Sequence, residues 1–152
     1  MHSSSVRRGR SGTTLVESGL ALSFTFSLLI GLVVLGMGVF RYQQTAAVAR
    51  EAARWASVRG GLYAQETGQP AATQDSVKNQ VIPRYASGLD PNHITVFTVT
   101  WDDASRMPVY YDYTRQVWRS NAVHVTISYE WIPEAYLAGI TLTSTSEMPM
   151  SY

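Results

Sequence analysis

Residues 18–40 have the sequence SGLALSFTFSLLIGLVVLGMGVF, an apolar stretch between Glu17 and Arg41 that contains no charged side chain. The stretch is about 23 residues long, and a helix needs roughly 20 residues to cross a bilayer. At a rise of about 1.5 Å per residue it extends about 34 Å, which matches the hydrocarbon core with some tilt. We therefore expect a single transmembrane helix at residues 13–40, in contact with membrane lipid.

Two other interpretations of this stretch are weaker. A buried core helix would need more protein around it than the rest of a chain of 152 residues offers. A cleaved secretory signal would have an apolar region of about 7–15 residues, which is shorter than this one. An amphipathic helix also follows the stretch directly, which favours a membrane anchor.

The composition excludes several classes of protein. The chain has no cysteine, so disulfide scaffolds, cysteine-ligated zinc and thiol catalysis are excluded. The formal net charge is only +1, and no overall field favours nucleic acid as a partner. The basic segment at residues 7–10 is a weak nucleic-acid signal, because it lies beside a membrane span.

The flanks of the span predict its orientation. Arg7, Arg8 and Arg10 precede the span with no acidic residue before Glu17, whereas the arginines that follow the span are sparser. Positively charged flanks stay in the cytoplasm. We expect a cytoplasmic N-terminus and an exported domain at residues 60–152.

The residues at the membrane entry allow two interpretations that can hold together. Thr14 and Glu17 have the spacing of a capping box, in which each side chain bonds to the backbone of the other's position. A carboxylate in the first helical turn also complements the helix dipole. This interpretation is purely structural and requires no function.

The second interpretation is a processing site. A basic leader at residues 1–12 ends in Gly12, and Glu17 follows after four residues. This arrangement resembles the processing site of type IV prepilins, in which a membrane-embedded aspartic peptidase cuts after the glycine and the acid is the fifth mature residue. The resemblance implies a cut between Gly12 and Thr13 by a prepilin peptidase. A carboxylate at the edge of hydrocarbon needs a partner, and the new α-amino group of Thr13 would supply one to Glu17.

The helix is expected to continue beyond the membrane over residues 41–59. Small side chains recur there at steps of three and four residues, which predicts a narrow packing stripe. The stripe consists of Tyr42, Ala46, Ala49, Ala53 and Ala56. We favour packing of this stripe on the chain's own sheet, with a helix–helix contact in a filament as the alternative.

Residues 60–152 are predicted to form an exported α+β domain. Residues 62–73 are polar and are expected to be a loop, followed by a short helix at 76–82 that Asp75 or Thr73 caps and that ends or kinks at Pro83. A turn is expected at residues 87–91, a long connection at 102–121, and a short helix from Pro133 to Gly139.

Three segments of this domain have the pattern of strands. Residues 94–101 are β-branched and aromatic, residues 123–131 alternate strictly between apolar and polar, and residues 140–146 form a last strand before a tail at 148–152. The expected fold is α+β, with the long N-terminal helix packed on a small antiparallel sheet.

The sequence gives little indication of catalysis, and we expect no enzyme, no cofactor and no metal. His93 and His124 are scattered, and His124 lies on the polar side of a strand. Asp102, Asp103 and Asp112 lack the spaced ligand loop of a calcium site, so solvated turns are the better interpretation. A second set, Tyr110, Tyr111 and Tyr113, is either a partner surface or a cover for the sheet edge.

Taken over most of its length, the chain resembles the TadE-like family, minor pilin-like proteins of the bacterial tight-adherence pilus system. The segments that carry the resemblance are 7–9 (RRG), 12–17 (GTTLVE), 47–56 (AVAREAARWA), 123–133 (VHVTISYEWIP) and 141–148 (TLTSTSEM). Members commonly have Phe or a similar apolar residue where this chain has Ser18. The resemblance implies a single-pass protein of the bacterial inner membrane that assists pilus assembly together with other pilin-like subunits.

Two alternatives from other classes remain open. The first is a membrane-anchored extracytoplasmic binding module that is not built into a filament, and the second is a soluble domain released by signal peptidase. Processing at Gly12 separates the pilin-like hypothesis from the simple anchor, because an anchor has no need of it.

Overall fold

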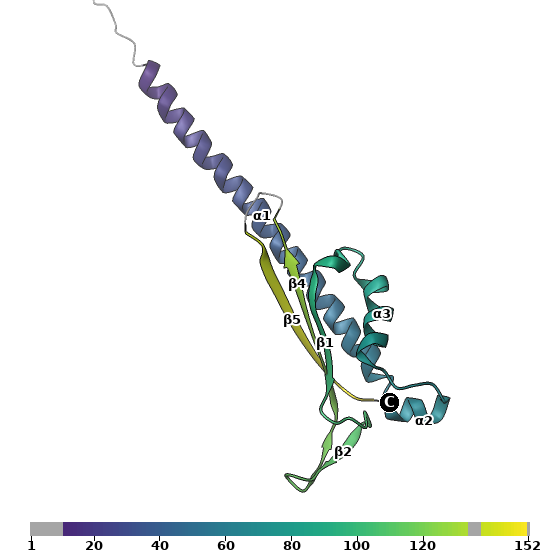
Figure 1. The fold of residues 1–152 in the computed structure, drawn as a ribbon. Helices are drawn as coiled ribbons and strands as arrows, with labels where there is room; N and C mark the ends of the chain where they lie inside the picture. The colour runs from purple at the N-terminus through teal and green to yellow at the C-terminus, as the bar shows by residue number, and fades with distance from the viewer. Residues whose placement is uncertain (1–10, 134–137, 152) are drawn as a thin grey trace, which may run out of the picture. The chain divides into compact units, whose positions relative to one another are not determined.

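The computed structural model describes residues 11–133 and 138–151. Its dominant element is α1 (Ser11–Ser57), a helix of 47 residues (Figure 1). The helix continues through Gly31, Gly36 and Gly38 without interruption, which confirms the long helix that the sequence predicts. Because α1 includes Ser11, Thr14 lies inside the helix and not at its N-cap. The capping-box interpretation of Thr14 and Glu17 is therefore wrong.

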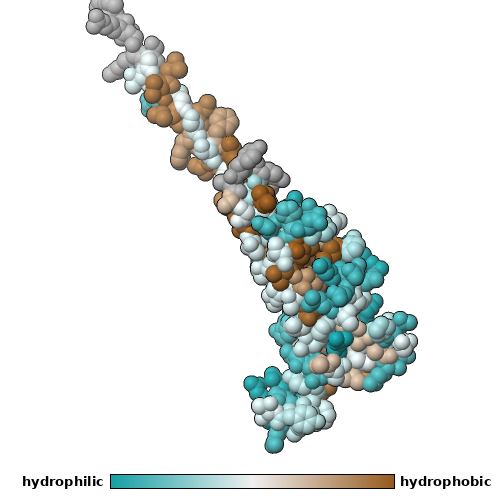
Figure 2. Space-filling model, viewed as in Figure 1, coloured by the Kyte–Doolittle hydropathy of each residue, from teal (hydrophilic) through white to brown (hydrophobic). Residues whose placement is uncertain are grey.

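The chain divides into two compact units, Met1–Met37 and Gly38–Tyr152. The described part of the first unit is helix alone. In the described residues, α1 is the one helix long and apolar enough to cross a membrane, and none of its most apolar window is buried. Figure 2 shows large hydrophobic side chains along this part of the helix. The second unit begins inside the predicted span of residues 13–40, three residues before Arg41.

The second unit is an α+β domain that confirms the predicted fold class. Its sheet has the order β1–β4–β5, with β1 (Ile94–Trp101), β4 (Ala122–Trp131) and β5 (Ile140–Pro149) in antiparallel pairing. All three predicted strands are confirmed, and β5 extends into the expected tail. The long alternating segment becomes the central strand β4, which is the position that most needs an apolar face.

The core lies between this sheet and the C-terminal part of α1. The buried side chains of the sheet include those of Val99, Val123, Val125 and Ile127. The buried side chains of α1 are small and include Val48, Ala49, Ala52, Ala53 and Ala56. Packing of the alanine stripe on the chain's own sheet is thus confirmed, although Tyr42 is exposed and lies outside the buried face.

Helix α3 (Gln74–Tyr85) covers the β1 side of the sheet with Val77, Val81 and Ile82 (Figure 1). Thr73 is its N-cap and forms a capping box with Ser76. Of the two predicted caps, Thr73 and Asp75, the first is therefore confirmed. The helix extends past Pro83, which lies in its last turn, because a proline there removes only one backbone hydrogen bond. A 3-10 turn, η1 (Pro91–His93), leads from the predicted turn cluster into β1.

Two elements differ from expectation. The predicted loop at residues 62–73 contains α2 (Gly61–Thr67), a short helix with no buried residue. The predicted connection at residues 102–121 contains a separate antiparallel hairpin of β2 (Val109–Asp112) and β3 (Val117–Ser120). The helix predicted between Pro133 and Gly139 falls mainly on residues 134–137, which lie outside the described residues.

Candidate functional site

The predicted processing residues lie in the first turns of α1. Gly12, Thr13 and Glu17 are all exposed, and nothing lies within 4 Å of the position that a Cβ of Gly12 would take. Thr13 and Glu17 are four residues apart, so they lie on the same face of the helix. Among the described residues no cation forms an ion pair with Glu17. The described residues of the junction are therefore accessible.

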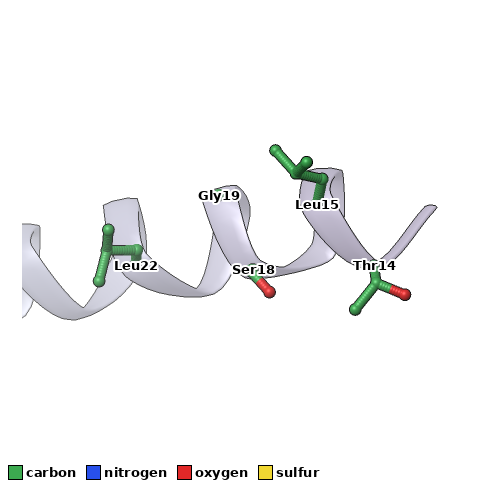
Figure 3. Close-up of a pocket in the computed structure, with 5 residues that line it drawn as sticks. All are labelled: Thr14, Leu15, Ser18, Gly19 and Leu22. Carbon is green, nitrogen blue, oxygen red and sulfur yellow. The ribbon is translucent and has the colours of Figure 1, made fainter. Parts of the chain in front are cut away.

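A shallow notch follows this junction along the helix. Gly19 lies between Leu15 and Leu22, with Thr14 and Ser18 on the neighbouring side (Figure 3). No atom lies within 4 Å of the position that a Cβ of Gly19 would take. A small residue between two leucines lets another helix approach closely, which is how helices associate within lipid.

The polar side chains inside the apolar stretch bond to their own helix. The hydroxyl groups of Ser23, Thr25 and Ser27 donate to backbone carbonyls four residues earlier, at distances of 2.8–2.9 Å. These bonds satisfy groups that would otherwise be costly in hydrocarbon. The hydroxyl groups of the stretch are thus compatible with a membrane span.

Of the three predicted tyrosines, Tyr110 and Tyr111 lie in β2 and Tyr113 follows it directly in sequence. Tyr110 and Tyr111 are partly buried, whereas Tyr113 is 85% exposed. Tyr111 packs edge-on against Tyr113 at 5.0 Å between ring centroids, and against Trp118 of β3 at 5.4 Å. We call Tyr111, Tyr113 and Trp118 the aromatic cluster.

The strand pairing shows where the aromatic cluster lies. The hairpin is a sheet of its own and does not pair with the edge strands β1 or β5 in the described residues. The cluster therefore lies on a hairpin that does not extend the main sheet by backbone pairing, and both interpretations of the tyrosines stay predictions. Sequence reasoning misses Trp118, because it predicts only a connection at residues 117–120. The register that places Trp118 opposite Tyr111 comes from the turn between the strands.

The acidic residues each bond to different neighbours. Asp102 Oδ1 lies 2.9 Å from His124 Nε2, Asp103 accepts from the amide of Ser105, and Asp112 accepts from two amides of its own turn. In the described part of the chain no three acidic, histidine or cysteine side chains are grouped to hold a metal ion. The calcium alternative for these three aspartates has no geometric support.

His124 is held between two carboxylates on the outer face of the sheet. Its Nδ1 lies 3.8 Å from Glu147 Oε2, on the side opposite Asp102. His93 lies 4.0 Å from Asp90 at the start of β1. Among the described residues, the ion-pair partners of the two histidines are carboxylates.

Comparison of the chain with family models, curated proteins and solved structures finds no match.

Proposed function

We propose that this chain is a non-enzymatic, pilin-like protein of the bacterial inner membrane that assists assembly of a tight-adherence-type pilus. The observation that supports the proposal is that α1 contains both the exposed apolar stretch and a buried face of the sheet domain. Its apolar part, residues 18–37, is mostly exposed, whereas one face of residues 48–57 is buried in the core of the sheet domain. One helix thus serves as membrane segment and as the scaffold of the exported domain. Movement of that helix into a filament would carry the domain with it.

The junction supports this proposal through charge. In the uncut chain Glu17 lies in the second turn of α1, which begins at Ser11. A cut by a prepilin peptidase after Gly12 would make Thr13 the first residue and leave Glu17 one helical turn from the new amine. There the positive end of the helix dipole and the new amine both favour a carboxylate. The amine could belong to the same subunit or to a neighbouring pilin-like subunit.

The notch at Gly19 is the contact that we assign to a neighbouring helix. Because lipid tails are as apolar as leucine, helices in a membrane associate through close packing and not through hydrophobicity alone. A notch lined by Leu15, Ser18, Gly19 and Leu22 offers that packing within two turns of Glu17.

The test combines the mature N-terminal mass in native cells with pilus yield. We expect a mature chain that begins at Thr13. Gly12→Leu should block the cut and reduce pilus yield, and Glu17→Gln should leave the cut intact but reduce the yield. Removal of one partner of a dehydrated ion pair costs about 3–5 kcal/mol. Glu66→Gln, at an exposed position of α2, is the matched control and should have the wild-type yield.

An uncut N-terminus in the parent, together with wild-type pilus yield for Glu17→Gln, would contradict the proposal. It would leave a membrane-anchored binding module as the better function.

One observation favours that second candidate. The aromatic cluster exposes Tyr113 and Trp118 on the hairpin, and exposed aromatic residues are typical of binding surfaces. Trp118→Ser with Tyr113→Ser should abolish partner binding in a binding module. The same double variant should leave pilus yield unchanged if the helix alone drives assembly.

A further inference from the structure

One end of the sheet domain contacts α1 within the helix's own apolar stretch. Gly38 lies within the uncharged residues 18–40, and Trp131 at the end of β4 packs on it. The Trp131 ring carbons Cζ3 and Cη2 lie 2.9 and 3.3 Å from the position that a Cβ of Gly38 would take. Gly38 is three residues before Arg41, so the contact lies about 4.5 Å further along the helix axis toward the membrane than the first charge. Both residues belong to the same compact unit.

The same end of the domain exposes large apolar side chains. Trp131 pairs with Ile140, the first residue of β5, so the connection between β4 and β5 leaves the sheet here. Ile140 is 48% exposed and Ile132 is 53% exposed. On α1, Val39 and Phe40 at this level are each 58% exposed. Apolar residues thus surround this end on both the helix and the sheet.

We propose that this end of the domain, which exposes Ile132 and Ile140, is inserted into the lipid headgroup layer of the membrane. The inference rests on the membrane anchoring in the proposed function and adds a second contact, made by the sheet. The layer between hydrocarbon and water is about 5–7 Å thick on each side of a bilayer. A contact one helical turn inside the first charge therefore lies in that layer or at its inner edge.

Two charged residues fix how deep the domain inserts. The Arg41 guanidinium donates to the carbonyl of Gly88 and to Gln44 Oε1, so the domain itself satisfies this charge close to the lipid. Glu130 is exposed one residue before Trp131, and its Oε1 lies 3.2 Å from the position that a Cβ of Gly139 would take. A carboxylate there requires hydration, so the insertion ends in the headgroup layer and does not reach the hydrocarbon.

The absence of cysteine in the natural chain makes a direct test simple. Single variants Ile132→Cys and Ile140→Cys carry an environment-sensitive fluorophore, and the full chain is reconstituted in vesicles of phosphatidylethanolamine and phosphatidylglycerol. The vesicles contain nitroxide lipids with the quencher either at the headgroup or deep in the acyl chain. Thr145→Cys, at an exposed position further along β5, is the matched control. Leu35→Cys, 70% exposed on α1, reports the span itself.

We expect the labels at positions 132 and 140 to be quenched several-fold more strongly by headgroup nitroxides than the label at position 145. The label at position 35 should respond mainly to the deep nitroxides. If position 35 is quenched while 132 and 140 behave like 145, the domain is clear of the membrane and the inference is wrong, with the anchoring intact. If position 35 is not quenched, the anchoring itself fails.

A third outcome also overturns the inference. Labels at 132 and 140 that report an apolar environment without quenching by either lipid would mean that protein covers this end, either a second copy or another subunit. Labels at these positions replace side chains that are already half exposed, and a far-ultraviolet circular dichroism spectrum equal to that of the parent shows that each variant is folded.

Discussion

At the scale of single residues, the contact between Gly38 and Trp131 gives a sharp comparison within one helix. Nothing lies within 4 Å of the position that a Cβ of Gly36 would take, whereas a Cβ at Gly38 would meet the Trp131 ring at 2.9 Å. Alanine is preferred over glycine in helices by up to about 1 kcal/mol, and this gain is shared by both positions. Any difference between the two substitutions therefore reports the contact with the sheet.

We predict that Gly38→Ala lowers the free energy of unfolding of the domain by about 1–3 kcal/mol through overpacking. Gly36→Ala should leave it unchanged or slightly higher. The measurement is thermal unfolding of the full chain in lipid nanodiscs, followed by near-ultraviolet circular dichroism of the tryptophans. Equal midpoints for the two variants would show that the sheet does not press on Gly38.

Asn121 is the buried polar residue that organises the loop before β4. Its side chain is fully buried. Its Oδ1 accepts from the amide of Asp103 at 3.1 Å, and its Nδ2 donates to the carbonyl of Met107 at 2.9 Å. We predict that Asn121→Ala costs about 2–4 kcal/mol of folding free energy, because two backbone groups lose their partners in the interior.

The control for this prediction is Asn92→Ala, at an exposed position of η1, which should change stability little. Chemical denaturation of both variants in the same detergent gives the comparison. A midpoint for Asn121→Ala within error of the control would contradict the role assigned to these hydrogen bonds.

Asn121 also shows why a residue of this kind is not predicted from sequence. A single asparagine before a strand is typical of a turn, and its burial depends on Asp103 and Met107 being folded over it. Glu17 is a similar case. Its spacing from Thr14 fits a capping box, but the helix begins three residues earlier, at Ser11. The spacing of a motif does not determine where the helix around it begins.

At the scale of elements, the alanines of α1 set the distance between helix and sheet. Ala49, Ala52, Ala53 and Ala56 are fully buried, whereas Ala47 faces outward. Small side chains allow the helix to approach the sheet closely, and a larger residue would have to displace one of them. We predict that Ala53→Leu destabilises the domain by at least about 1–3 kcal/mol, while Ala47→Leu does not.

Proteolysis of the reconstituted chain provides the measurement for this pair. Ala53→Leu should make residues after Arg59 susceptible at a lower temperature than in the parent, and Ala47→Leu should match the parent. If the two leucine variants behaved alike, the buried alanine face would not be the packing surface of the sheet.

Most of the elements that the sequence predicts have a buried face. Strand β4 is predictable because its apolar residues alternate, and β1 because its residues are β-branched and aromatic, with the predicted bounds of residues 94–101. Strand β5 has no buried residue and is predictable only from its β-branched residues. Helix α2 and the hairpin of β2 and β3 are not predicted, because they lack a buried apolar face. No residue of α2 is buried, and every residue of β3 is exposed. Without burial there is no apolar period to detect.

At the scale of the whole molecule, the dominant feature is the exposed apolar surface of residues 18–40. Large side chains such as Leu20, Phe24 and Leu35 are each about 70% exposed. Soluble monomers rarely expose so large a continuous apolar surface. The length of the candidate membrane helix and the α+β domain that follows it in sequence are predictable from hydropathy and from the spacing of apolar residues. The aromatic cluster does not, because it depends on a hairpin register that only the folded chain provides.

We predict the orientation of the chain in the membrane from the arginines that flank the candidate span. We predict that alkaline phosphatase fused after Tyr152 is active, and that a fluorescent protein that matures only in the cytoplasm is dark at the same position. Lysine and arginine determine topology when they lie within about 15–20 residues of a span. Replacement of Arg7, Arg8 and Arg10 by Gln should therefore produce a mixture of the two signals.

The control for topology is Arg84→Gln with Arg115→Gln, since both arginines are exposed and lie far beyond that range. These two changes remove charge without touching the flank, and the phosphatase should stay fully active. The domain has no cysteine, so its own folding does not depend on the redox state of the compartment. A bright cytoplasmic reporter after Tyr152 in the parent would place the sheet domain inside the cell, where it could join neither a pilus nor an extracytoplasmic partner.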